Sequence, residues 1–173
     1  MSHQTSALPI AYVFLRILIL INWLSGAFIL ALLTATIVAQ DWTFRALGIT
    51  PDSGIPQMIM GLRAIAALGI VAVLLNSGLL KRLLAIVETV KAGDPFVAAN
   101  AFRLHTIAWL LLGLQLLSLV IGGIGHQIST PHNPLHLDAG FLPMGWLAVL
   151  LAFVLARVFA EGTLMREDLE GTV

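Results

Sequence analysis

Four long apolar stretches, separated by short polar segments, occupy most of this chain. A helix that crosses a hydrocarbon core of about 30 Å needs about 20 predominantly apolar residues, and each stretch provides about that number. A water-soluble helix would show a polar face, which these stretches almost lack. The pattern therefore predicts an all-α membrane protein whose spans cover residues 14–38, 57–80, 105–124 and 141–160.

The connecting segments predict how the four spans pack. Short loops place consecutive helices side by side with opposite directions. We therefore expect a single membrane domain over residues 1–173, an antiparallel four-transmembrane-helix bundle. The first apolar stretch lacks the basic start and the short apolar core of a signal peptide, so we interpret it as a retained span.

The helical pattern continues beyond the second span. Charged side chains alternate there with leucine, isoleucine and valine, and these charged residues are Lys81, Arg82, Glu88 and Lys91. An amphipathic helix of this kind either leaves the membrane or lies along its surface. The sequence thus predicts a cytoplasmic amphipathic extension of the second helix.

A corner follows this extension. Gly93 fits the C′ position after a helix, where a positive φ is needed. Asp94 fits an N-cap, and Pro95 fits the first position of the next helix. The ring of Phe96 is then free to pack into apolar surface, so the segment predicts a sharp turn between two helices.

Composition and charge exclude several classes of protein. The chain is 59% hydrophobic and only 10% charged, whereas a soluble domain usually carries about 25% charged residues. Nine basic and nine acidic residues cancel without forming a block, which argues against direct nucleic-acid binding. The absence of cysteine excludes disulfides, thiolate chemistry, cysteine-based zinc sites and iron–sulfur clusters.

The distribution of lysine and arginine predicts the orientation, because short cytoplasmic loops carry an excess of both. The first and third loops hold few, with Arg45 in the first loop and Arg63 just inside the second span. Both termini and the middle loop are therefore expected in the cytoplasm, flanked by Arg16, Lys81, Arg82, Lys91, Arg103, Arg157 and Arg166.

Two segments resemble a known family. The motif residues are the sequence GDPF at 93–96 with Asn100 and Leu104 after it, and FAEG at 159–162 with Leu164 and the ending EDLEGTV at 167–173. They are similar to the bacterial domain-of-unknown-function family 2975 (DUF2975). The resemblance implies a four-helix protein of the bacterial cytoplasmic membrane with no assigned activity and no catalytic residues. Genes of this family often neighbour small helix-turn-helix regulators, so the resemblance also implies a regulatory role.

The loop between the third and fourth spans contains the candidate metal ligands His126, His132, His136 and Asp138. Neutral imidazoles and a carboxylate are ligands for zinc, nickel or copper. The spacing of the three histidines matches no standard pair of helical metal ligands. Pro134 disfavours a regular helix between His132 and His136. The alternative interpretation, which we favour, is a wet loop with histidines near the lipid headgroups.

Charged residues at the predicted cytoplasmic end of the fourth span form a second candidate functional site. Arg157 and Glu161 are four residues apart and can pair on one helix face. Arg103 and Arg16 are expected at the same membrane depth, so Glu161 is predicted to be shared among arginines. A proton or ion gate is one interpretation. The one we favour is an interface that locks the fourth span to the middle loop through Asp94, Pro95, Phe96, Asn100, Arg103, Arg157 and Glu161.

A few polar residues lie within the spans. Amide side chains between helices usually form interhelical hydrogen bonds of about 1 kcal/mol, which we expect for Asn22, Asn76 and Gln115. An unpaired arginine is costly inside a membrane. Arg63 is therefore expected to extend outward or to pair with an acidic residue of the outer loops, with a substrate clamp as the alternative.

The sequence shows no catalytic constellation, so we predict no enzymatic activity and no cofactor. A bis-histidine haem needs two histidines at one depth, and only His105 lies near the inner side. The favoured function is a regulatory or interaction module. The alternatives are an oligomeric transporter or channel component and a metal-binding protein. The expected partners are the bilayer, a cytoplasmic regulatory protein and a second copy of the chain.

Overall fold

The computed structural model describes residues 7–39, 42, 55–129 and 141–170. Nearly all of them belong to four long helices, and no strand occurs among them. These helices are α1 (Ala7–Val38), α3 (Ile55–Lys91), α4 (Ala98–Ile128) and α5 (Pro143–Glu170). Each is long and apolar enough to cross a membrane, which confirms the predicted all-α, four-span architecture.

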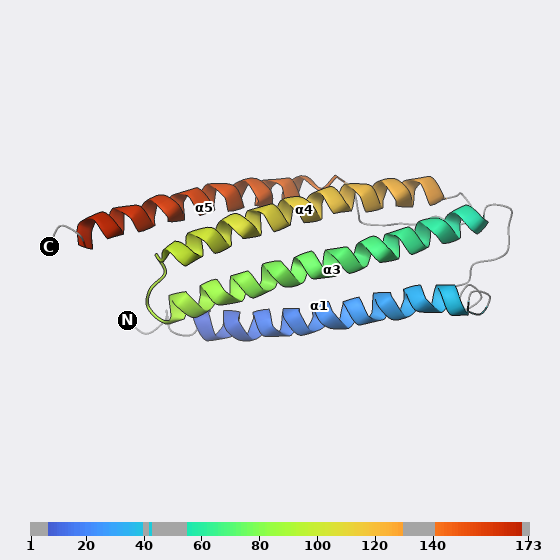
Figure 1. Cartoon of the computed structure of the whole chain (residues 1–173), viewed down its shortest axis with the longest axis horizontal. Coiled ribbons are helices and arrows are strands. Elements are labelled where there is room, and N and C mark those ends of the chain that lie inside the picture. The colour runs from blue at the N-terminus through green and yellow to red at the C-terminus, as the bar shows by residue number, and fades with distance from the viewer. Residues whose placement is uncertain (1–6, 40–41, 43–54, 130–140, 171–173) are drawn as a thin grey trace.

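The helices form an open, antiparallel row in which each packs on its neighbours in the sequence (Figure 1). α1 packs on α3, α3 on α4, and α4 on α5, while no other pair of these four helices brings Cα atoms within 8 Å. The two edge helices, α1 and α5, therefore each contact a single neighbour. A closed arrangement, in which the first and last helices also meet, is not formed.

The helices are longer than the spans predicted from hydropathy alone. They contain 32, 37, 31 and 28 residues, which corresponds to about 42–56 Å at 1.5 Å per residue. A hydrocarbon core is about 30 Å thick, so each helix projects beyond it. α3 runs through Lys91 as one continuous helix beside α4 (Figure 1). The amphipathic extension thus continues the span in line and does not turn along the membrane surface.

Much of the apolar surface faces outward. Leu20, Phe28 and Leu150 are each more than 60% exposed, whereas Ala108 is fully buried between neighbouring helices. Lipid tails are as apolar as these side chains, so helix contacts in a membrane depend on close packing and not on hiding apolar groups. The outward-facing leucines and phenylalanines are accordingly typical of a lipid-facing surface.

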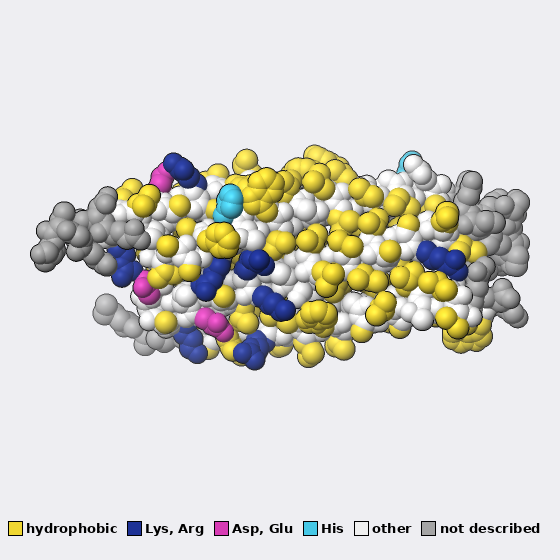
Figure 2. Space-filling model, viewed as in Figure 1, with side chains coloured by type: hydrophobic (Ala, Val, Ile, Leu, Met, Phe, Trp, Pro, Cys, Tyr) yellow, Lys and Arg dark blue, Asp and Glu magenta, His cyan; other side chains and the backbone are white. Residues whose placement is uncertain are grey.

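Basic side chains gather at the end of the row that carries both chain termini (Figures 1 and 2). We call it the basic end, and its residues are Arg16, Lys81, Arg82, Lys91, Arg103, Arg157 and Arg166. They lie near the start of α1 and α4 and near the end of α3 and α5, which the antiparallel packing brings together. Arg63, near the start of α3, lies at the opposite end.

Candidate functional site

The turn at the basic end begins with a hydrogen-bonded C-cap of α3. Gly93 has a φ of 89°, its amide donates to the Val90 carbonyl at 3.1 Å, and the Asp94 amide donates to the Thr89 carbonyl at 3.1 Å. This pair of bonds is a Schellman motif with Gly93 at C′. The prediction that glycine ends the helix here is therefore confirmed.

The prediction that Asp94 caps the next helix is wrong. α4 begins at Ala98, and Val97, its N-cap residue, has an extended backbone and makes no side-chain cap bond. The Asp94 amide is part of the C-cap of α3, through its bond to the Thr89 carbonyl. The Asp94 carboxylate accepts a hydrogen bond from Arg166 of α5. Pro95 consequently lies in the connecting segment and not at the first helical position.

Asn100 is the centre of this turn and the largest fully buried side chain among the described residues. Its Nδ2 donates to the Thr89 Oγ1 at 2.7 Å and to the Pro95 carbonyl at 2.9 Å. Its Oδ1 accepts from the Arg103 Nη1 at 2.8 Å. A buried amide with both donors and its acceptor satisfied holds its neighbours in one geometry. Asn100 thus connects α4 to the end of α3.

The prediction that Glu161 is shared with Arg16 and Arg103 is wrong, because Arg16 donates to the Tyr12 hydroxyl and Arg103 to Asn100. Arg103 donates to the Ala85 carbonyl of α3 at 3.3 Å as well as to Asn100. Glu161 pairs with Arg157, whose Nε lies 2.7 Å from its Oε1. The predicted Arg157–Glu161 pair is therefore present, whereas Arg103 of α4 bonds to the backbone of α3.

An aromatic contact adds α5 to the turn. The ring of Phe96 stacks on Phe159 with centroids 5.3 Å apart, so Phe96 packs on apolar surface as expected. Together with the Asp94–Arg166 ion pair, this contact joins the connecting segment to α5. We call the whole assembly the three-helix corner; its residues are Thr89, Gly93, Asp94, Phe96, Asn100, Arg103, Phe159 and Arg166.

Two amides within the spans bond between α1 and α3, as predicted. The Asn76 Nδ2 donates to the Asn22 Oδ1 at 2.8 Å, and the Asn22 Nδ2 donates to the Val73 carbonyl at 3.1 Å. Asn22 is buried. Gln115 likewise donates from α4 to the Leu142 carbonyl at 3.3 Å, just before α5. These amides connect neighbouring helices.

Arg63 bonds to a backbone group at the opposite end of the row. Its Nη2 donates to the Thr36 carbonyl, which is one of the last four carbonyls of α1. A cation is also favoured by the helix dipole at this position. Sequence reasoning missed this acceptor, because it considered only acidic partners for Arg63.

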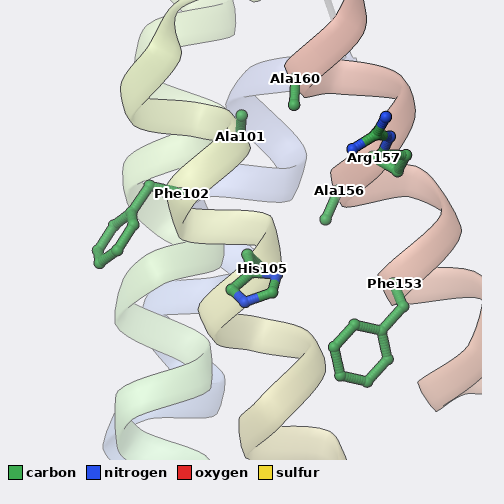
Figure 3. A pocket seen from close by; sticks show the side chains of 7 residues that line it. All are labelled: Ala101, Phe102, His105, Phe153, Ala156, Arg157 and Ala160. Carbon is green, nitrogen blue, oxygen red and sulfur yellow. The ribbon is translucent and has the colours of Figure 1, made fainter.

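A groove of about 480 Å³ lies between α4 and α5 near the basic end. Ala156 and Ala160 of α5 face Ala101 of α4 across it, with His105 and Arg157 at its sides (Figure 3). Small alanine side chains leave this space open. Sequence reasoning missed the groove, because periodicity alone does not show where two helices diverge.

An aromatic cluster borders this groove. Trp109 and Phe153 meet edge to face with ring centroids 5.5 Å apart, and His105 lies edge to face against Phe153 at 5.9 Å. The Trp109 Nε1 donates to the His105 Nε2 at 3.1 Å. A neutral His105 imidazole therefore carries its proton on Nδ1.

Only one of the candidate metal ligands lies within the described residues. His126 is exposed near the end of α4, whereas His132, His136 and Asp138 fall outside the described ranges. In the described part of the chain, no three histidine, cysteine, aspartate or glutamate side chains are grouped as metal ligands. The proposed metal site therefore stays a prediction.

Four long apolar helices in an antiparallel row define a multi-pass α-helical membrane protein. The chain belongs to the family described as Protein of unknown function (DUF2975), whose sequence profile matches residues 51–173. The matched range contains the three-helix corner and the groove, and it confirms the family resemblance. No curated protein and no solved structure matches the chain.

Proposed function

We propose that this protein is a non-enzymatic regulatory module of the bacterial cytoplasmic membrane. In this role it transmits a change in the bilayer or envelope to a soluble cytoplasmic protein. The main support is the three-helix corner, in which Asn100 joins the projecting end of α3 to α4, while Phe96 and Asp94 of the connecting segment contact α5. A rigid projection at the end of a membrane helix is suited to presenting a docking surface of constant shape.

The exposed charges of this projection supply the proposed docking surface. Lys81, Glu88 and Lys91 are exposed along the end of α3, and Lys81 and Lys91 lie over the rings of Trp23 and Tyr12 of α1. Arg82 bonds to its own helix, and Phe96 stacks on α5 but stays 44% exposed. Arg82 therefore stabilises the fold, and a partner can contact Glu88, the outer faces of Lys81 and Lys91, and the exposed part of the Phe96 ring.

Photocrosslinking tests the docking surface directly. A photoreactive residue replacing Glu88 is expected to form one main adduct with a soluble protein in native membranes. A Lys91→Glu change should reduce the yield several-fold, because it reverses one of the three exposed charges between residues 81 and 91. In the matched control, the photoreactive residue replaces Leu150, which is exposed in the middle of α5. Absence of an adduct at Glu88, or the same adducts at both positions, would reject this surface.

The proposed orientation, with both termini in the cytoplasm, rests on the basic end. Because the chain has no cysteine, each introduced cysteine is a unique label site. We expect a membrane-impermeant maleimide to label Gln127→Cys in spheroplasts, and Glu88→Cys only after lysis. Both positions are exposed, at opposite ends of the row. The reverse labelling pattern would show that the basic end faces outward.

A further inference from the structure

The groove between α4 and α5 combines an apolar space with a cation at its rim. Its lining contains alanine and phenylalanine side chains, and His105 and Arg157 are its polar members. A volume of about 480 Å³ falls within the usual range of small-molecule pockets. The lining suits an apolar group that ends in an anion.

Arg157 is positioned to receive that anion. It is the first charged residue along α5 from the Pro143 end, and its side chain is 79% exposed. Among the described residues, Glu161 is its only hydrogen-bond partner, through Nε. The two terminal nitrogens therefore keep their N–H donors, and a guanidinium matches phosphate oxygens in pairs.

His105 supplies a second donor on the other side of the groove. Trp109 donates to its Nε2, so the Nδ1 of the neutral ring carries a proton. His105 and Arg157 thus stand on different helices, α4 and α5, and both line the same space (Figure 3). His105 packs against Phe153, four residues before Arg157 on α5, so Arg157 is the donor nearer the basic end and His105 lies deeper, beside the first part of the lipid tail.

We infer that this groove binds one anionic phospholipid of the surrounding bilayer. The phosphate is bound by Arg157, and an acyl chain runs from there past Ala156 and Phe153, away from the basic end. A zwitterionic lipid fills the same apolar space, but its own cation reduces the attraction to Arg157. This inference does not depend on the proposed regulatory role.

Quenching of tryptophan fluorescence tests the inference, because Trp109 borders the groove. The chain is reconstituted with Trp23, Trp42 and Trp146 each replaced by phenylalanine, and its fold is checked by circular dichroism and gel filtration. Vesicles combine phosphatidylcholine and phosphatidylglycerol, with bromine on the acyl chains of one or the other. Brominated phosphatidylglycerol should quench Trp109 at an about fivefold lower mole fraction than brominated phosphatidylcholine, which is the advantage expected for one basic side chain at the surface.

Paired variants separate a specific site from general surface charge. Arg157→Gln with Glu161→Gln leaves the net charge unchanged and should reduce the fivefold preference to about one. Glu88→Gln with Lys91→Gln removes one charge of each sign at the same end, outside the groove, and should keep the preference. If the first pair keeps it, or the second loses it, the inference is overturned.

Two further measurements identify the ligand. Ala160→Leu is expected to reduce quenching by both brominated lipids, since the larger side chain fills the groove. Millimolar inorganic phosphate should leave the quenching unchanged. Reversal of the quenching by phosphate would assign the site to a soluble anion and overturn the lipid assignment.

Discussion

Replacing Asn100 with alanine is expected to reduce the free energy of unfolding by about 2 kcal/mol, the range found when a buried hydrogen-bonding group loses its partners. The side chain is fully buried, and its loss removes two donated bonds and one of the two acceptors of the Arg103 guanidinium. SDS titration of the protein in mixed micelles measures the change.

Gln127→Ala is the matched control for this variant. Gln127 is an amide on the same helix but is exposed, so its loss should cost less than about 0.5 kcal/mol. Asn100→Ala and Thr89→Val should be less than additive when combined, because both remove the same hydrogen bond. An Asn100→Ala variant as stable as Gln127→Ala would contradict the central role of Asn100 in the corner.

Adding one methyl group at Gly26 is expected to separate α1 from α3. A Cβ at this position would lie 2.8 Å from the Val73 Cγ1, and Val73 is buried and stiff at χ1. Overpacking of this kind costs about 1–3 kcal/mol. The displaced helices would also weaken the bond from Asn22 to the Val73 carbonyl. SDS titration of Gly26→Ala gives the loss of stability.

Gly123→Ala isolates the clash from the general effect of adding a methyl group to a helix. Nothing lies within 4 Å of a Cβ at Gly123, so this change should gain helix propensity of up to about 1 kcal/mol in full. Val73→Ala should cost less in the Gly26→Ala background than in the wild type. Equal stability of the Gly26→Ala and Gly123→Ala variants would show that α1 and α3 do not approach closely at this point.

Hydropathy predicted the membrane class and the number of spans. Each side chain has its own preference for lipid or water, and the sum of these preferences over about 20 consecutive residues identifies a span. It did not predict how far each helix extends. Residues 98–104 are helical although they lie outside the predicted third span; the turn signal at residues 93–95, and not hydropathy, predicted a helix there. The role of Gly93 could also be predicted from the sequence, because the ability to adopt a positive φ is a property of the glycine residue itself.

The sequence by itself determined that lipid is the main solvent of this chain, where its four helices lie and which residue ends α3. Only the tertiary structure decided that the helices form an open row, that Asp94 pairs with Arg166 across 72 residues, and that Arg63 reaches the end of α1. It also decided that a groove opens beside Arg157. The reason is physical: a burial preference belongs to a residue and its near neighbours, whereas the partner of a hydrogen-bonding group is set by which helices come side by side.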